Sequence, residues 1–245
     1  LNFGSPESPS IYWQLTESIA GMAQACRELG IPITGGNVSL YNETNGQAIY
    51  PTPVIGMVGL IENQDQIRSV GWQNSGDLVF LLGETKRGLG GSEYLEVMHN
   101  LVTGSLPELD LTAEKALQKL LLQSGNLIKT AQDVSDGGLA VTLVKSSLWG
   151  NLGVNVQLPS SDLRLDTQLF GESPSRVVIS VDPAQAEKVV SLAQSQGVPI
   201  TELGVVGGEH VLINGAKELI ELSLAQAQSV FEQVLPARLD KEEQS

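Results

Sequence analysis

The chain has 245 residues, 41% of them hydrophobic and 17% charged, so it can bury a core in one large domain or two ordinary ones. Its net charge of -14 leaves no basic stripe to meet phosphates, which argues against a nucleic acid or an anionic membrane as partner. A nucleotide is not excluded, because Mg²⁺ and backbone N–H groups can neutralise a triphosphate locally. The single cysteine provides no disulfide framework.

No segment of the sequence directs the chain to a membrane. No apolar run reaches about 18 residues, and the first residues, LNFGSPESP, lack the basic and apolar regions of a signal peptide. We therefore expect a cytoplasmic protein. The sequence does not begin with Met, and we interpret it as a fragment of a longer protein.

The first predicted element is a helix over residues 8–30. Apolar side chains recur there at three- and four-residue steps and form one stripe. Ser8 is expected to cap the helix, Pro9 suits its first position, and Gly30 is expected to end it.

Two short strands are predicted around a polar loop. Residues 31–34 form the first, and the run 51–61, PTPVIGMVGLI, is apolar on both faces, which is typical of a strand covered on both sides. Between them, Asn45-Gly46 predicts a tight turn.

The composition divides the chain into two domains. We expect a first domain at 1–62, a polar linker at 63–76, a second domain at 77–235 and a solvated or disordered tail at 236–245. In the second domain, strands and helices interleave, which indicates an α/β or α+β fold. The predicted strands are 77–82, 153–158, 176–182, 200–206 and 210–213, and the predicted helices are 92–101, 112–124, one from DVSDGG to Trp149, 183–197 and 224–235.

The stretch GGNVSLYNE, residues 35–43, carries more polar groups than a turn needs. Gly35 and Gly36 let the backbone come close to a ligand, and Asn37 can offer a carbonyl oxygen to Mg²⁺. Ser39 lies two residues on, so in an extended segment it shares a face with Asn37. A loop built from common turn-forming residues explains the same composition.

Three further motifs have both a ligand-binding and a structural interpretation. GETKRGLGG, residues 83–91, resembles a phosphate loop loosely but lacks the Walker spacing, so it also fits a strand-to-helix connection. Asp133 and Asp136 of DVSDGGL stand at a helix start, where Asp136 can act as a cap. Arg176 and the serines of ESPSR could grip a phosphate, or Glu172 and Arg176 could form a solvated pair. No nucleophile with a nearby base is apparent, so we name no catalytic residue.

The motifs LNFGSPE, TGGNVSLYNET and YPTPVIGMVGLI resemble the phosphoribosylformylglycinamidine synthase family of purine biosynthesis. DVSDGGL, preceded by GETKRGLGGSEYL, is similar to the C-terminal domain of the wider aminoimidazole-ribotide synthetase superfamily. The resemblance covers nearly the whole chain and departs at Ser5, where the family usually has Asn. It implies an α/β (α+β) fold in which 1–62 is the truncated N-terminal-type domain of a second tandem copy, followed by its C-terminal-type domain.

The resemblance also implies roles for three residues: Gly36 contacts ATP, Asn37 binds Mg²⁺ and Ser39 contacts substrate. The implied reaction converts formylglycinamide ribonucleotide, ATP and glutamine-derived ammonia to the amidine, ADP and phosphate. The family's catalytic histidine and lysine belong to the first copy, so this chain alone is expected to be inactive.

The implied partners are the missing N-terminal half, a glutaminase subunit and a small bridging subunit. Two alternatives remain open. One is a structural nucleotide-binding or interface module of the same enzyme. The other is a different member of the superfamily, related to selenophosphate synthetase or thiamine-phosphate kinase.

Overall fold

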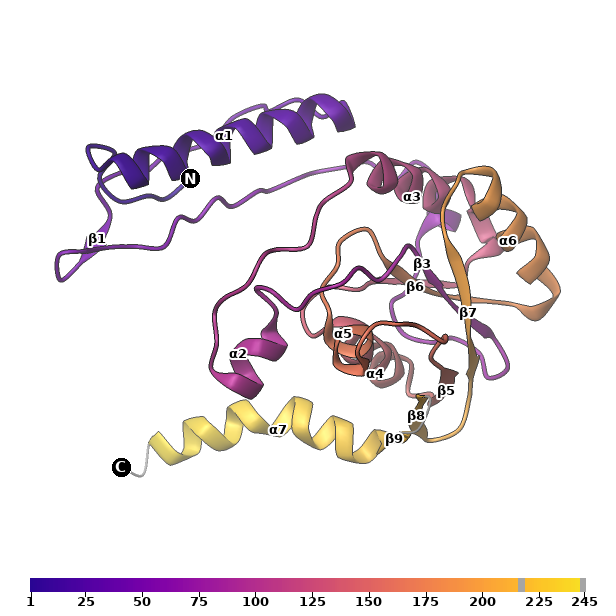
Figure 1. Ribbon diagram of the computed structural model, residues 1–245. Coiled ribbons are helices and arrows are strands. Elements are labelled where there is room, and N and C mark those ends of the chain that lie inside the picture. The colour runs from indigo at the N-terminus through magenta and orange to yellow at the C-terminus, as the bar shows by residue number, and fades with distance from the viewer. Residues whose placement is uncertain (216–218, 243–245) are drawn as a thin grey trace. The chain divides into compact units, whose positions relative to one another are not determined.

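The computed structural model describes residues 1–215 and 219–242, in two compact units. Unit 1 comprises Leu1–Glu62 and unit 2 comprises Asn63–Ser245. Figure 1 labels most of the helices and strands of both units. None of the helices in the described part of the chain is long and apolar enough to cross a bilayer.

Unit 1 contains one long helix, α1, at Pro9–Leu29, which confirms the predicted helix. Gly30 ends it in the left-handed conformation, with φ of 69°, and its N–H donates to the carbonyl of Cys26. Ser8 stands at the N-cap position, but its side chain makes no capping hydrogen bond. Its hydroxyl pairs with Ser10 Oγ at 3.1 Å instead, so the prediction that Ser8 caps the helix was wrong.

A two-residue hairpin follows the polar loop. Strands β1, Glu43–Thr44, and β2, Gln47–Ala48, pair antiparallel around Asn45 and Gly46. Both turn residues have positive φ, 51° and 74°, which confirms the predicted tight turn. The buried centre of this unit is Phe3, with no exposed surface. Its neighbour Gly4 has no room for a side chain, because an added Cβ would lie 2.7 Å from the side chains of both Ala48 and Ile11.

The two strands predicted at 31–34 and 51–61 are not formed. Residue Thr52 makes an isolated bridge to Asn2, but among the described residues no backbone hydrogen bond involves 54–61. A strand requires a neighbour to pair with, and the described chain places none beside this segment. Its large apolar side chains are exposed instead: Val54, Ile55, Met57, Val58, Leu60 and Ile61.

Unit 2 is built on a seven-stranded sheet with the order β4-β6-β3-β7-β5-β8-β9. Every neighbouring pair is antiparallel except β5 and β8, which run parallel. The strands are β3 Leu78–Leu82, β4 Thr130–Asp133, β5 Val154–Gln157, β6 Val177–Val181, β7 Ile200–Val206, β8 His210–Asn214 and β9 Leu219–Ser223. The helices are α2 Glu93–His99, α3 Leu111–Gln123, α4 Gly138–Gly150, α5 Leu165–Phe170, α6 Ala186–Ser195 and α7 Leu224–Glu242, with short 3₁₀ turns at Gln64–Gln66, Gly125–Leu127 and Pro183–Gln185.

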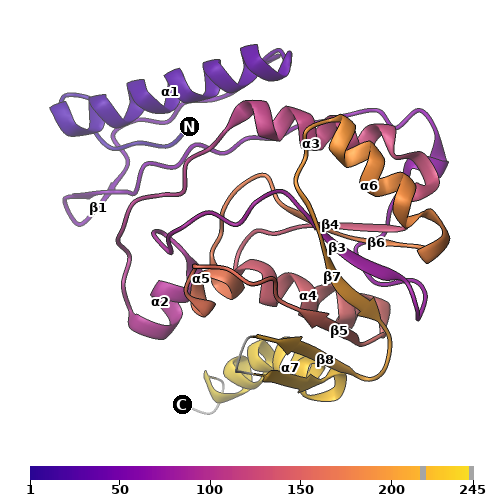
Figure 2. The same ribbon diagram turned by 45° about the vertical axis from the view of Figure 1, so that its right-hand side comes forward.

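Helices cover both faces of the β3 region, as Figure 2 shows. Alternate residues of β3 enter two separate cores, because successive side chains of a strand point to opposite faces. Val79 and Leu81 join the core that contains Leu139 and Leu143 of α4. On the other face, Phe80 and Leu82 join the core formed with α3 and α6. Each of the five predicted strands and of the predicted helices of unit 2 is present, with boundaries that differ by a few residues apart from the end of α7. The α/β class is therefore confirmed.

The predictions for unit 2 missed strands β4 and β9 and helix α5, besides two short 3₁₀ turns. Strand β4 has the sequence TAQD and α5 the sequence LDTQLF, which are too short and too polar for periodicity to identify. Strand β9 has the sequence LIELS and exists because β8 offers it a pairing edge.

Two boundary segments differ from the expected linker and tail. In the second half of 63–76, Trp72 is buried and donates its ring N–H to Ser147 Oγ at 2.9 Å, so this part packs into unit 2. Helix α7 does not stop at residue 235 but continues to Glu242 through Pro236. The residues after the proline, ARLDKE, are mostly strong helix formers, which explains the continuation. The last three residues of the expected tail, 243–245, lie outside the described residues.

Candidate functional site

The first half of GGNVSLYNE is an exposed strip. Ser39 N–H donates to the carbonyl of Leu1 at 2.8 Å, and Phe3 N–H donates to the carbonyl of Ser39 at 3.0 Å. These bonds hold the backbone extended beside the first residues. The side chains of Asn37 and Ser39 lie on the same side, where Asn37 Nδ2 donates to Ser39 Oγ at 3.3 Å. The geometry therefore has the shared face that the two-residue offset predicted.

Nothing in residues 1–215 and 219–242 requires glycine at positions 35 and 36. An added Cβ at Gly35 or Gly36 would meet no atom within 4 Å, and neither residue has the positive φ that favours glycine. Open space therefore lies beside this backbone, next to Asn37. A ligand that approaches the main chain closely would explain the two glycines.

The second half of the stretch has a structural role. Tyr41 N–H donates to the carbonyl of Gly4 at 3.1 Å, and Asn42 N–H donates to the carbonyl of Phe3 at 3.1 Å. The side chain of Asn42 also donates to the Phe3 carbonyl, at 3.2 Å. These residues fasten the loop to the core of unit 1 and lead into β1. The two interpretations of GGNVSLYNE therefore apply to different halves.

The side-chain oxygen of Asn37 is the candidate ligand for a magnesium ion in this strip. The amide nitrogen of Asn37 faces Ser39, which leaves its side-chain oxygen as the group able to bind a hard cation. No cluster of three or more His, Cys, Asp or Glu side chains that could hold a metal exists among the described residues. One neutral oxygen fits Mg²⁺ only where phosphate oxygens and water complete its shell, which is how proteins often bind this ion.

In unit 2, Arg176 is buried and does not form a solvated pair with Glu172, so that interpretation of ESPSR was wrong. The phosphate-binding interpretation stays a prediction, since Arg176 and Ser175 line a cavity. The side chain is 2% exposed. Three of its five N–H groups donate, to the carbonyl of Ser173 at 3.0 Å, the carbonyl of Gly171 at 2.6 Å and Thr85 Oγ1 at 3.0 Å. Burial lowers the pKa of Arg176 to about 10, and the charge of the nearby Glu172 opposes that shift. The guanidinium therefore stays charged near neutral pH and holds the 171–176 loop together.

Asp136 does not cap α4, which corrects the capping interpretation of DVSDGGL. The N-cap residue is Gly137, in the left-handed conformation with φ of 80°. Its N–H donates to Glu172 Oε1 at 2.9 Å, so a carboxylate from another part of the chain supplies the negative charge. Asp133 and Asp136 instead line an open cavity of about 390 Å³, together with Glu114, Ser135, Glu172, Ser175 and Arg176.

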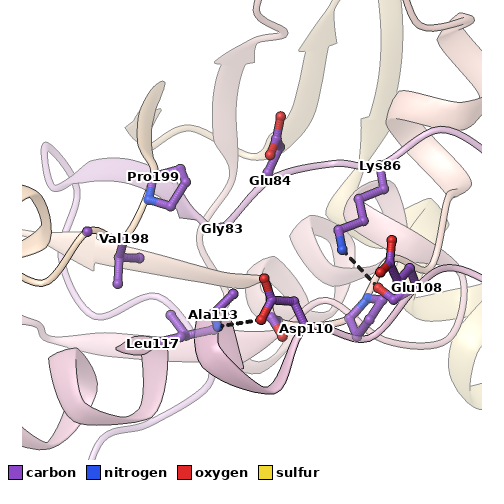
Figure 3. A pocket seen from close by; sticks show the side chains of 12 residues that line it. Gly83, Glu84, Lys86, Glu108, Asp110, Ala113, Leu117, Val198 and Pro199 are labelled. Atoms are coloured by element: carbon purple, nitrogen blue, oxygen red, sulfur yellow. Dashed lines mark hydrogen bonds between the residues drawn. The ribbon is translucent and has the colours of Figure 1, made fainter. Parts of the chain in front are cut away.

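The glycine-rich loop GETKRGLGG is a packed connection from β3 toward α2. Gly83 has φ of 86°, and an added Cβ would lie 2.1 Å from the carbonyl oxygen of Ser175. The backbone N–H of Lys86 donates to Ser173 Oγ at 3.0 Å. This loop borders a smaller cavity of about 120 Å³, shown in Figure 3. There Lys86 Nζ donates to the carbonyl of Glu108 at 2.9 Å, and Asp110 caps α3 by accepting from Ala113 N–H at 3.1 Å.

Gly36, Asn37 and Ser39, which the sequence predicts to lie together, are neighbours in unit 1. The sequence did not predict the role of Glu172, whose carboxylate accepts hydrogen bonds from backbone N–H groups 35 and 79 residues away. No local signal could have identified these contacts. The only indication was a glutamate placed after a glycine at the end of a short apolar run.

Two family models match this chain and define the class of protein to which it belongs. Residues 1–61 match the family model described as AIR synthase related protein, N-terminal domain, and residues 74–213 match that of the C-terminal domain. The chain belongs to the AIR synthase related protein family. The resemblance of its motifs to this superfamily is confirmed.

The most similar relatives point to one member of this family. The chain is 45% identical over 239 residues to a protein of a Nocardioides species named phosphoribosylformylglycinamidine synthase subunit PurL, covering 98% of this chain and 31% of that protein. Proteins of the same name from a Thermoanaerobacter and a Synechococcus species are 47% and 48% identical, over 91% and 94% of this chain and 31% of each relative. The chain thus spans about a third of the length of these relatives.

Solved structures show the same fold. PurL of Thermotoga maritima, complexed with ATP, matches with a TM-score of 0.63 at 18% identity, over 85% of this chain and 34% of that one. The hydrogenase maturation protein HypE of E. coli matches with a TM-score of 0.62 at 20% identity, over 92% of this chain and 71% of that one. Proteins with different names therefore share this fold. The fold alone does not identify a function, so the functional proposal rests on the sequence identity to the relatives named above.

Proposed function

We propose that the chain is part of an ATP-dependent ligase of purine biosynthesis. The complete enzyme would convert formylglycinamide ribonucleotide, ATP and glutamine-derived ammonia to formylglycinamidine ribonucleotide, ADP and phosphate. The observation that carries this proposal is the identity of 45–48% to proteins named phosphoribosylformylglycinamidine synthase subunit, over more than nine tenths of this chain. Because those relatives are about three times as long, the rest of the enzyme would supply the remaining parts of the reacting centre.

Within that enzyme, we assign the strip Gly36–Ser39 to the active site. Gly36 would lie against ATP, Asn37 would offer its side-chain oxygen to Mg²⁺, and Ser39 would hydrogen-bond the substrate. The exposure of Gly36 and Asn37, the common face of Asn37 and Ser39 and the open space beside Gly36 support these roles. Bound Mg²⁺ would neutralise phosphate charge. The contribution of this chain would be positioning, and we assign no catalytic residue to it.

The proposed assembly has several components. Residues 1–62 would form the N-terminal-type domain of the second copy, truncated, and 77–235 its C-terminal-type domain. The partners would be the missing N-terminal half, a glutaminase subunit and a small bridging subunit, in the cytoplasm. The solved structure of PurLQS from Thermotoga maritima, which has the same fold as this chain, supports an assembly of several subunits.

The test of this assignment is reconstitution. The chain is mixed with a separately expressed polypeptide that covers the other two thirds of the relatives' length, with the glutaminase components, substrate, glutamine and Mg-ATP. Asn37→Ala is expected to lower the rate of ADP release about 100-fold, as loss of a charge-stabilising group does. Ser39→Ala is expected to act mainly on the KM for the ribonucleotide, about tenfold. ADP formation is followed by a coupled assay.

Gln47→Ala is the matched control, because this exposed amide also lies in unit 1 but outside the strip. It is expected to keep the wild-type rate. Equal rates for Asn37→Ala, Ser39→Ala and wild type would show that the assigned roles are wrong. No ADP release from the wild-type mixture would count against the proposed function itself.

The alternative, a self-contained nucleotide-binding module, is tested on the chain alone. Titration calorimetry with Mg-ADP at millimolar concentration should give saturable heat if such a site exists. Absence of heat would contradict the module and leave the divided active site as the function to test.

A further inference from the structure

Glu172 joins two helices that are far apart in the sequence. It follows α5, in the loop that leads to β6. Its Oε1 atom accepts from Gly137 N–H at 2.9 Å and from Glu93 N–H at 2.9 Å. Gly137 is the N-cap residue of α4, and Glu93 is the first residue of α2. One carboxylate oxygen therefore serves the beginnings of both helices.

The surrounding packing fixes the position of this carboxylate. Tyr94 in the first turn of α2 stacks on Phe170, with ring centroids 4.9 Å apart and planes within 6°. At the start of α4, Gly138 fits closely against the end of α5, because an added Cβ would lie 2.7 Å from the carbonyl oxygen of Leu169. Both helices are thus held against the residues immediately before Glu172, and its side chain reaches both N–H groups.

The chemistry of this position is that of an anion site. The beginning of a helix carries partial positive charge and free N–H groups, and glycines there leave room for a phosphate. In this chain the internal carboxylate already occupies that place. The adjoining 390 Å³ cavity is lined by further carboxylates, those of Glu114, Asp133 and Asp136. The one cationic side chain in its lining, Arg176, donates three of its five N–H groups to protein acceptors.

We propose that Glu172 is a built-in anion, a positioning residue that takes the place of a ligand phosphate at the start of α4 and couples α2 to α4. The carboxylates that line the cavity, Glu172 among them, then repel anionic groups electrostatically. This inference concerns unit 2 and does not depend on the function proposed for the Gly36–Ser39 strip.

Hydrogen exchange followed by mass spectrometry on the whole chain tests the coupling. In Glu172→Ala, the rate of amide exchange is expected to rise about tenfold in segment 92–95, which contains the donor Glu93, and in segment 136–140, which contains the donor Gly137. The reason is that each segment loses a hydrogen bond to a charged group. Glu114→Gln is the matched control: this carboxylate lines the same cavity but accepts from the side chains of Gln118 and Ser175. It should leave both segments unchanged.

Chemical rescue separates an anion's role from a merely structural one. Inorganic phosphate at 10–50 mM (roughly the range in which a single exposed anion site fills) should restore protection to segment 136–140 in Glu172→Ala. Sodium chloride at equal ionic strength should not, and phosphate should not change exchange in the wild type.

Three results would overturn the proposal: a change in only one of the two segments, no restoration by phosphate, or equal protection by phosphate in the wild type. If Glu172→Ala does not fold, Glu172→Gln takes its place. Its oxygen can accept both bonds without the charge, so exchange in the two segments should rise together about threefold. Unchanged exchange in that variant would contradict the role of the negative charge.

Discussion

Replacing Arg176 with alanine is expected to lower the free energy of unfolding of unit 2 by about 3 kcal/mol. The side chain is almost fully buried, and its removal leaves the carbonyls of Gly171 and Ser173 and the hydroxyl of Thr85 without their donor. Each unsatisfied buried acceptor costs about 1–3 kcal/mol, and part of that cost is offset because a charge no longer has to be desolvated. Urea unfolding followed by far-UV circular dichroism measures the change.

Two further variants identify the source of the effect. Arg176→Met keeps most of the apolar volume and loses the hydrogen bonds, so it should be nearly as destabilised as the alanine variant if the hydrogen bonds dominate. Arg164→Ala is the matched control, since that arginine is exposed and pairs with Asp166 on the surface. It should unfold at the wild-type urea concentration. An Arg176→Ala midpoint equal to that of Arg164→Ala would contradict the role assigned to the buried guanidinium.

The isolated chain is expected to associate with itself through residues 53–61. This segment combines exposed apolar side chains with backbone N–H and C=O groups that have no partner in the described chain. An exposed sheet edge has the same two properties and pairs readily with another chain. Val58→Lys combined with Leu60→Lys should weaken association at least about 100-fold, because a buried aliphatic side chain contributes about 1.5–3 kcal/mol. Sedimentation velocity over a concentration series measures the shift.

Val97→Lys is the control for this prediction. Val97 is also exposed, but it lies on α2 of unit 2, where the backbone is already hydrogen-bonded within a helix. It should leave association unchanged. A wild-type chain that sediments as a monomer at 100 μM (about the range in which weak dimers form) and unfolds cooperatively would contradict the expectation.

Local signals predicted many of the elements, with boundaries shifted by a few residues. The apolar stripe of α1 and its final Gly30 depend on neighbours within one or two helical turns, and the Asn45-Gly46 turn depends on two residues. The same is true of the shared face of Asn37 and Ser39, which follows from the period of an extended chain. These features could be read from the sequence because the atoms that cause them are close along the chain.

Long-range contacts decided the rest. The run 51–61 has the composition of a buried strand, but a strand forms only beside a partner, and the described chain brings none to it. Arg176 looked like a ligand group or a surface charge, and its burial depends on Thr85, which is 91 residues earlier. Its hydrogen bonds therefore belong to the fold of unit 2.

The sequence by itself determined the family, the α/β class and the shared face of Asn37 and Ser39, because these rest on motifs and periodicities contained in short segments. Only the tertiary structure decided that the glycine-rich loop, DVSDGGL and ESPSR form an internally hydrogen-bonded assembly centred on Glu172 and Arg176. The physical reason is that a buried polar group takes whichever partner the fold brings within hydrogen-bond distance, and that partner can lie anywhere in the chain.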